Sequence, residues 1–508
     1  MSATEAAKTE NTNGIRLHKL SPLFILFNGI KQAIIPLLLG GSYYRMSNNM
    51  EHFVTAFIIL GALLPILSYW FYHYWINTDA LVVKEGIFFK KNRKIPYKRI
   101  QNVNVLQGPL QRILKVATLQ LESASGGKPE AVLRVVDLTV VETIKHKVKQ
   151  ATLVANENTQ SKQTTAEPAE PLLRLSTNEV IKIGVISQKG MVIGAVLFGF
   201  MAQNQAFIDS LVNYFNLFFT LPDFTKITLA QSLVYISVIG LVIFISLQIL
   251  SIIWAMLKFF KFEISKQSNR LQASMGLLAK ISATIPLKRI QLFRINENPL
   301  HKLFKTQSIT IETAGGVNTD KAGIVMRWIA PLIGRDKTSA FLAQVEEKIN
   351  YQEIIWQNIP ARAWKRVIKR ALIQLVLFSV GLITVASVPA IEVRFYAWII
   401  ILCMVPLTYV YAKNYVKKTA YFINDDIICF KSGIWFGKQS LLKISNIQTI
   451  EIIETFFDRR NKMATLEIDT AGSNPLLHHI KIPYLERNKA FEIRNFLSNK
   501  VNAMDFDW

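Results

Sequence analysis

The sequence predicts a multidomain integral membrane protein, with six transmembrane α-helices in three hairpins and three antiparallel β-barrel modules, each closed by a C-terminal helix. Three observations lead to this fold class: paired apolar runs, an internal repeat, and an excess of basic residues. The 508 residues are 51% hydrophobic with a net charge of +24, and the mean hydropathy is +0.26. Membrane spans with basic cytoplasmic parts account for both values, whereas a nucleic-acid-binding protein would explain only the charge.

The internal repeat aligns three segments of the chain without gaps. Gly86–Gly126 matches Gly276–Gly316 at one constant offset, and a third copy begins at Gly433. Apolar residues alternate in Thr118–Glu122 and in Ser308–Glu312, which is the pattern of a half-buried strand. The glycines after these strands mark tight turns. Each copy is therefore predicted to be a small antiparallel β module.

Six apolar runs form three pairs, with one pair before each β module. A helix needs about 20 residues to cross a hydrocarbon core of about 30 Å, and a short loop at 45–52 separates the first two runs. Trp and Tyr residues cluster at their ends, where amphipathic rings favour the interface. The predicted runs are Leu20–Tyr44, Phe53–Trp75, Lys189–Phe218, Leu229–Leu257, Ala371–Ala390 and Phe395–Tyr411.

Lys31 lies inside the first apolar run and has two interpretations. It is either a functional cation within the membrane or a side chain that reaches the headgroups from an interfacial segment. The later hairpins favour the interfacial interpretation, because Lys189 and Arg370 directly precede their densest apolar stretches. The first helix of each hairpin is then expected to begin as an amphipathic segment and to cross the membrane only beyond its basic residue.

Composition and pattern divide the chain into segments. We expect helices at Asp137–Val154, Thr338–Ile349 and Glu486–Val501 to close the modules, and a Gln-, Thr- and Pro-rich stretch to form a flexible linker. The predicted segments are a disordered tail at 1–15, hairpins at 16–76, 173–258 and 351–417, modules at 77–153, 259–350 and 418–502, and the linker at 154–172.

Basic residues flank the module side of the hairpins, whereas the short loop of the third hairpin is nearly neutral. There Arg366 and Lys417 lie on the module side, and Glu392 and Arg394 cancel in the loop. The positive-inside rule therefore predicts that the modules, the linker and both termini are cytoplasmic. The two cysteines form no disulfide or metal-site pattern, which fits a reducing compartment.

The repeated motif resembles a known family. The residues Gly-Ile-Phe, Ile-Pro, Arg-Ile-Gln, Gly-Pro-Leu-Gln-Arg and Leu-Glu-Ser-Ala-Ser-Gly within Gly86–Gly126 are similar to the bacterial PH-like domain, and three copies behind hairpins look like the YdbT-type membrane proteins. The third copy departs, with Leu442-Lys443 in place of Ile-Pro and Asn446 in place of the arginine. The resemblance implies PH-like modules, a bacterial inner membrane and a role in envelope defence, but no reaction and no ligand.

No set of residues indicates catalysis, a cofactor or a metal ion. His478-His479 is the only histidine pair, and adjacent strand residues point to opposite faces, which makes them poor joint ligands. The sequence has no Walker-type phosphate loop and no zinc-protease motif. We therefore expect a protein that is not an enzyme and that carries no cofactor.

Basic residues recur at matching positions of the three copies. In each copy two bases stand three residues apart in an expected helical turn, where they would share one face. They would then contact anionic lipid headgroups, or else form a solubilising surface pair. The first module adds a dense basic run, without the aromatic residues that a nucleic-acid platform requires. The candidate headgroup contacts are Lys90, Lys91, Arg93, Lys94, Lys98, Arg99, Arg112, Lys115, Lys302, Lys305, Arg459 and Lys462.

Two classes of function fit these features. The first is a non-enzymatic scaffold in the inner membrane, whose cytoplasmic modules bind lipid headgroups, a peptide or a partner protein. The second is a transporter or flippase-like protein in which three hairpins surround a path. Against the second, the apolar runs hold few charges beyond Lys31, Lys189 and Asp209. The sequence favours the scaffold.

Overall fold

A computed structural model describes most of the chain. The described residues are 14–24, 67, 69–86, 89–123, 129–156, 171–202, 209–210, 213–214, 228–267, 269–314, 327–346, 351–386, 394–470 and 479–503. The predicted tail up to residue 13, Lys31, most of the first hairpin and linker residues 157–170 lie outside this part of the chain.

Module 1 consists of two antiparallel sheets and a closing helix. Strands β1–β4 form one sheet, and β5–β7 belong to another. Leu81, Leu119 and Ile144 represent a single core that both sheets and α4 share. The elements are β1 Ile15–Arg16, β2 His73–Ile76, β3 Ala80–Glu85, β4 Lys91–Pro96, η2 Tyr97–Arg99, β5 Ile100–Gln107, α3 Pro109–Ile113, β6 Val116–Ser123, β7 Ala131–Asp137 and α4 Leu138–Asn156.

Modules 2 and 3 repeat this order and add described helices from their hairpins. In module 2 the elements are β8 Pro171–Arg174, α5 Thr177–Ser187, α6 Lys189–Ala202, α8 Leu229–Phe259, β9 Glu263–Gln267, β10 Arg270–Met275, β11 Lys280–Pro286, η3 Leu287–Arg289, β12 Ile290–Glu297, α9 Pro299–Leu303, β13 Thr306–Thr313, β14 Trp328–Gly334, η4 Arg335–Lys337 and α10 Thr338–Val345. In module 3 they are η5 Tyr351–Glu353, β15 Gln357–Asn358, η6 Ala361–Ala363, α11 Trp364–Ala386, α12 Arg394–Lys418, β16 Ala420–Ile423, β17 Ile427–Ser432, β18 Gly437–Lys443, η7 Ile444–Asn446, β19 Ile447–Ile453, α13 Phe456–Arg460, β20 Met463–Thr470, β21 His479–Glu486 and α14 Arg487–Asn502.

The backbone geometry explains one glycine in each copy. Gly86, Gly276 and Gly433 open the turns after β3, β10 and β17 with φ angles of 110°, 112° and 103°. A Cβ atom at these positions would lie 1.8–2.0 Å from a backbone carbonyl oxygen three residues later. Only glycine adopts this conformation without strain, so the backbone requires glycine at this position in all three copies.

The modules are not the separate barrels that the sequence predicts. Strand β5 of module 1 pairs with β11 of module 2, and β12 of module 2 pairs with β18 of module 3. Among the described residues, two seven-stranded sheets therefore each combine three strands of one module with four of the next. The alternation of apolar residues within a strand cannot reveal this pairing between modules, because the alternation is the same whichever segment of the chain pairs with the strand's edge.

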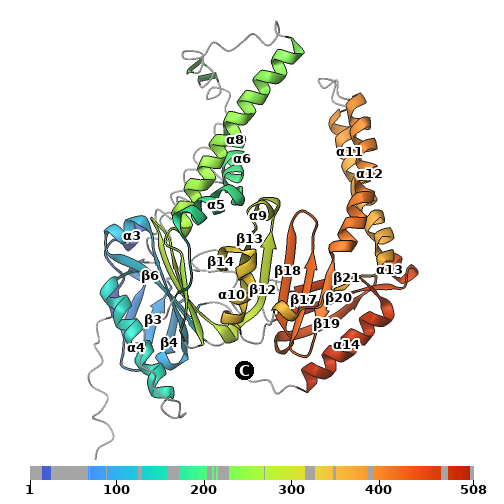
Figure 1. Cartoon of the computed structure of the whole chain (residues 1–508). Helices are drawn as coiled ribbons and strands as arrows, with labels where there is room; N and C mark the ends of the chain where they lie inside the picture. Colours follow the sequence, from blue (N-terminus) through green and yellow to red (C-terminus); the bar gives the residue numbers. More distant parts are fainter. Residues whose placement is uncertain are drawn as a thin grey trace, which may run out of the picture.

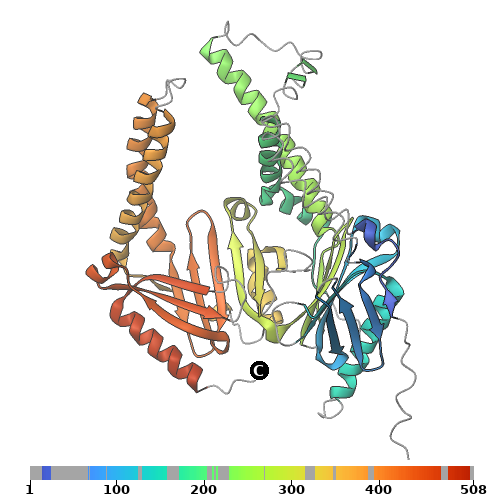
Figure 2. The same cartoon turned by 180° about the vertical axis from the view of Figure 1, so that it is seen from behind.

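The three modules lie in a row, and the described hairpin helices rise from one side of it (Figures 1 and 2). Each module begins earlier than predicted, because its first strand precedes its hairpin. Strand β8 pairs with β9 across α5–α8, and β15 pairs with β16 across α11 and α12. Likewise β1 pairs with β2. Each hairpin is thus inserted between the first two strands of its module.

The first helix of the second hairpin is broken in two. The amphipathic α5 buries Val180 and Ile183, and Gln188 then adopts a left-handed conformation before α6 begins at Lys189. The break agrees with the expected change from an amphipathic to an apolar segment at Lys189, while the interfacial position of the amphipathic part stays a prediction. Gly190 lets α6 approach α8, since a Cβ there would lie 1.8 Å from the carbonyl oxygen of Leu247.

One helix of the described residues, Ser237–Phe259 within α8, is long and apolar enough to cross a membrane. Only 11% of its apolar window is buried inside the molecule, so its side chains face outward rather than into a protein core. Helix α12 contains Pro406, and the helices of the first hairpin lie outside the described residues. Six spans therefore stay a prediction.

Candidate functional site

The candidate site is the edge of the row from which the hairpins rise. We call it the helix-side rim. It comprises the short helices α3, α9 and α13, each with the residues that follow it up to Lys115, Lys305 and Lys462. It also comprises the turns that join β3 to β4, β10 to β11, and β17 to β18. Leu277 in one of these turns donates its backbone N–H to Leu257 of α8. The rim therefore lies at the foot of the candidate membrane span.

The short helices are also tied to the hairpins. Asn298, which caps α9, donates from Nδ2 to the carbonyl oxygen of Ile186 at the end of α5, over 3.2 Å. In module 3, Arg366 of α11 donates to Asp458 of α13 over 2.6 Å, and both side chains are buried. Burial alone would raise the pKa of Asp458, but hydrogen bonds from Arg366 and Thr455 lower it overall. This buried ion pair thus fixes the position of α11 relative to α13 on the rim.

The second repeated base does not lie in a helix. Lys115, Lys305 and Lys462 each follow the short helix and adopt φ angles of 54°, 52° and 52°. The prediction that both bases share one helical face is therefore wrong in its geometry. A left-handed conformation costs a non-glycine residue roughly 1–2 kcal/mol, and Gly or Asn is the usual solution. Backbone preference does not explain why lysine is present three times.

Exposed apolar side chains accompany these lysines on the rim. Ile113, Leu303 and Phe456 of the short helices are 76%, 72% and 67% exposed. In the neighbouring turns, Phe89 and Trp435 are 84% and 67% exposed. Large apolar side chains gathered at one edge mark an interaction surface. The sequence pattern indicates the bases but not this apolar half of the surface, although Trp435-Phe436 beside a turn glycine is a visible signal of it.

The first repeated base joins neighbouring modules. Arg112 of module 1 donates to the carbonyl oxygen of Leu277 in module 2 over 2.9 Å, and Lys302 of module 2 donates to that of Ile434 in module 3 over 2.6 Å. Both carbonyls belong to the residue directly after a turn glycine. Arg112 and Lys302 are therefore partly engaged between modules, whereas Arg459 is exposed.

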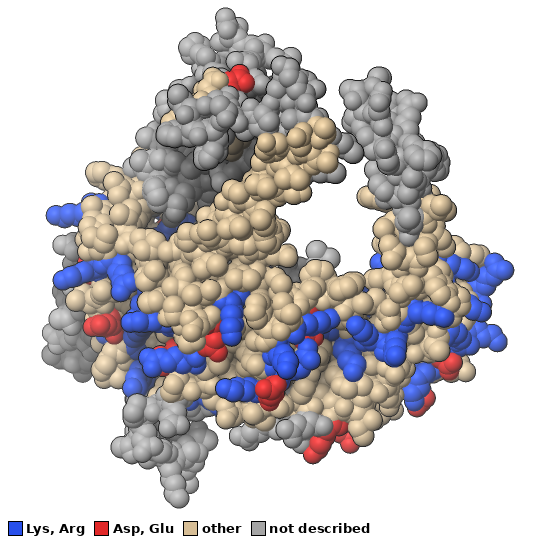
Figure 3. All heavy atoms as spheres, turned by 45° about the horizontal axis from the view of Figure 1, so that its top comes forward, with Lys and Arg blue, Asp and Glu red and all other residues tan. Residues whose placement is uncertain are grey.

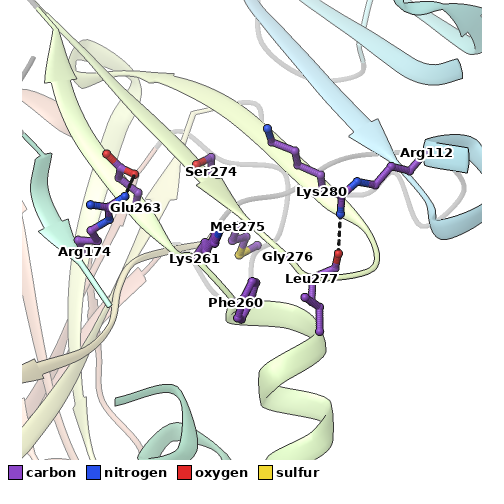
Figure 4. A pocket seen from close by; sticks show the side chains of 10 residues that line it. All are labelled: Arg112, Arg174, Phe260, Lys261, Glu263, Ser274, Met275, Gly276, Leu277 and Lys280. Carbon is purple, nitrogen blue, oxygen red and sulfur yellow. Dashed lines mark hydrogen bonds and ion pairs between the residues drawn. The ribbon is translucent and has the colours of Figure 1, made fainter. Parts of the chain in front are cut away.

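A pocket of about 290 Å³ opens at the joint of modules 1 and 2. Its cationic lining comprises Arg112, Lys261 and Lys280, together with Arg174, which forms an ion pair with Glu263 over 3.8 Å. Figure 4 shows Arg112 and Lys280 extending from different modules, near the foot of α8. With four bases and one acid, the pocket is suited to an anion.

The basic run of module 1 is spread along one strand. Lys90 and Lys91 lie at the rim end of β4, while Lys98 and Arg99 are exposed in η2 at its opposite end. Since strands rise about 3.3 Å per residue, these ends lie well apart. Arg93 is engaged within the module, 3.5 Å from Glu85 and bonded to the carbonyl oxygen of Glu130; Lys94 is exposed between them. The run is therefore not one patch.

The rim as a whole is basic. Figure 3 brings the hairpin side forward and shows Lys and Arg side chains in a band across the modules, with fewer Asp and Glu among them. His301 in α9 does not add to this charge, because burial lowers its pKa to about 4. In the part of the chain that the structure describes, no cluster of His, Cys, Asp or Glu could hold a metal ion.

Comparisons with known proteins agree with the repeat. The pattern of the bacterial PH domain family matches residues 26–152, 216–349 and 375–501. The chain is 27% identical over 507 residues to the UPF0699 transmembrane protein YdbT of Bacillus subtilis (strain 168), which covers 96% of this chain and 99% of that protein. No solved structure matches. Since the three matched segments make up most of its length and coincide with the three modules, the chain belongs to the bacterial PH domain family.

Proposed function

We propose that this protein is a membrane scaffold whose three modules form one platform against the bilayer and bind anionic lipid headgroups at the helix-side rim. Its hairpins are the anchors, and the positive-inside rule puts the platform in the cytoplasm. The similarity to a protein named as transmembrane supports the anchoring. The outward-facing apolar side chains of α8 support it independently.

One observation carries the headgroup proposal: exposed apolar side chains and left-handed lysines occur together on the rim in all three modules. An apolar side chain that enters the interface gains about 1.5–3 kcal/mol if it becomes fully buried. A base near an anionic leaflet adds about 1 kcal/mol. Lys115, Lys305 and Lys462 thus provide a benefit that compensates for their strained backbone. We assign one headgroup to the basic pocket beside Arg112.

Site-directed quenching tests whether the rim touches lipid. The full-length protein, with Cys403 and Cys429 changed to Ala, receives one labelled cysteine at Ile113, Leu303 or Phe456. It is reconstituted in phosphatidylcholine vesicles, with or without phosphatidylglycerol, that carry a quencher on the acyl chains. We expect quenching at all three positions, stronger with phosphatidylglycerol. A label at Lys98, exposed at the far end of β4, is the matched control and should not be quenched. Equal quenching at Lys98 and the rim would reject the proposal.

A charge variant separates binding from folding. Changing Lys115, Lys305 and Lys462 together to Asn removes three charges, while Asn accepts the left-handed conformation more readily. We expect unchanged or higher thermal stability, because the strain falls. The preference for phosphatidylglycerol should fall by about fivefold for each lysine, which corresponds to about 1 kcal/mol. A triple variant that keeps the full preference would show that these lysines do not contact headgroups.

A further inference from the structure

Within the part of the chain that the structure describes, two strand edges are unpaired at the ends of the row. Strand β4 of module 1 corresponds to β11 and β18, which pair with the preceding module, yet there β4 pairs only with β3. Strand β19 of module 3 corresponds to β5 and β12, which pair with the following module, yet among the described residues β19 pairs only with β20. The row therefore ends in two halves of the same joint.

The joint has a fixed register. Leu106 lies opposite Ile281 between modules 1 and 2, and Asn296 lies opposite Lys438 between modules 2 and 3. Counted from the turn glycines, these are equivalent pairs. If β19 and β4 met in the same register, Ile453 would lie opposite Lys91 and Glu451 opposite Arg93.

The edge at β19 is more exposed than its counterpart in module 2. Leu292, Phe293 and Ile295 of β12 are buried under the joint with β18. At the matching positions of β19, Thr449 is exposed and Ile452 is only partly buried. Apolar and backbone groups on such an edge favour pairing with another strand.

The charges of the two edges are complementary. Lys91, Arg93 and Lys94 make β4 basic, whereas Glu451 is exposed on β19. Opposite charges in directly facing positions stabilise an antiparallel pair. The bases on β4 also disfavour edge pairing with strands that lack acidic residues, which makes an acidic edge the selective partner.

A second charge pair extends the comparison. Within the chain, Glu122 of module 1 forms an ion pair with Arg289 of module 2 over 3.3 Å. At the two free ends, the matching positions hold Asp469 in module 3 and Arg99 in module 1. Arg99 is exposed. The two free ends therefore carry both charges of the ion pair that the joint between modules 1 and 2 contains.

We propose that the row continues between molecules, with β19 of one copy pairing with β4 of a second copy in the register used within the chain. Arg93 then faces Glu451, Arg99 faces Asp469, and the exposed Arg459 takes the place of Arg112 and Lys302. The contact is heterologous, so repetition produces either a ring or an open chain of molecules. Because the hairpins rise from one side of the row, such an assembly extends along the membrane surface.

Cysteine pairing tests the register in full-length protein. Copies with Arg93→Cys and copies with Glu451→Cys, differently tagged and lacking Cys403 and Cys429, are co-expressed, and membranes are oxidised mildly. Facing residues of an antiparallel pair have Cα atoms about 4.5–5.5 Å apart, which suits a disulfide. We expect a cross-link that joins both tags. The control pairs Arg93→Cys with Ile452→Cys, the next residue, whose side chain points to the other face.

Charge exchange provides a second measurement. Asp469→Arg and Arg99→Asp should each weaken association about tenfold in neutral detergent, measured by the concentration dependence of particle mass. Mixing the two single variants should restore association at the junctions where the exchanged charges meet. Cross-linking equal to the Ile452 control, together with unchanged mass in the charge variants, would overturn the proposal. Association in neutral detergent is independent of headgroup binding, so failure here leaves the function proposed for the rim unaffected.

Discussion

The joint between modules 1 and 2 and the joint between modules 2 and 3 pair their strands in one register, but different side chains hold them. Across the first, Arg289 reaches Glu122, and the side chain of Asn104 accepts the backbone N–H of Thr284. Across the second, Leu441 and Cys429 of module 3 enter the core of module 2. Lys443 also forms an ion pair with Glu346.

The difference shows which features of the joint are general. Backbone pairing and the base that reaches the following turn occur in both joints, so they define the contact. The polar network in one and the fused core in the other set its strength. Module 1 keeps a core without residues of module 2 among its described members, so we expect modules 2 and 3 to unfold together and module 1 to separate more easily.

The largest effect is expected in the fused core. Leu441 is fully buried, and Leu→Ala at such a site costs about 2–5 kcal/mol. In Leu441→Ala, modules 2 and 3 should lose stability together, as followed by thermal unfolding with domain-resolved hydrogen exchange. Thr284→Ala, at the matching position of the other joint, is the control and should cost under about 1 kcal/mol. Loss confined to module 3 would show that the two cores are independent.

A smaller effect is expected from the polar joint. Arg289 and Glu122 have side chains that are 12% and 21% exposed. A double-mutant cycle with Arg289→Gln and Glu122→Gln should give a coupling free energy of about 0.5–3 kcal/mol. The readout is protease cleavage between modules 1 and 2, because we expect this joint to open before the other. Additive effects of the two substitutions would mean that the ion pair does not hold the joint.

The dependence of stability on pH is expected to report on module 2, where Glu312 lies in β13. Burial raises the pKa of Glu312 to about 7, although Arg294 opposes the change. The folded protein therefore keeps its proton while the unfolded chain, with a carboxyl pKa near its ordinary value, loses it. The free energy of unfolding should fall as pH rises from about 4.5 to 7, by at most about 1.4 kcal/mol per pH unit. Glu312→Gln should remove this slope in chemical unfolding; an unchanged slope would assign it to another group.

The smallest effect concerns the bases that cross each joint. Arg112→Gln and Lys302→Gln each remove one hydrogen bond from a charged donor to a carbonyl; such a bond contributes about 1.5–3 kcal/mol when buried but only about 0.2–1 kcal/mol when exposed, and the lower range applies here. Arg112 is exposed and Lys302 is only partly buried, so Lys302→Gln should weaken its joint more. Hydrogen exchange of the turns at Leu277 and Ile434 reports each joint separately. A larger effect for Arg112→Gln than for Lys302→Gln would mean that this base contributes more to the joint between modules 1 and 2 than to the joint between modules 2 and 3.

The repeat and the helices that close modules 1 and 3 could be predicted from local pattern. Alternating residues and turn glycines specify strands, and α4 and α14 match the expected helices closely, whereas α10 ends at Val345. The joints could not be predicted, because strand pairing between modules depends on which edges meet. Strands β1 and β15 have only two residues each, too few for a period. The left-handed lysines were also hidden, since their residue type favours neither turns nor that conformation.

The insertion of each hairpin between two neighbouring strands has a consequence for biosynthesis. Strand β8 leaves the ribosome before α5–α8, and its partner β9 follows only after the whole hairpin. Since chains emerge N-terminus first, the early strand has no partner strand until the residues of the hairpin and of β9 have been synthesised. The sheet that β8 enters also contains β5–β7 of the previous module. With the membrane anchoring proposed above, the second and third hairpins would insert before a sheet shared by two modules can close, so failure of either insertion would leave both of those modules incomplete.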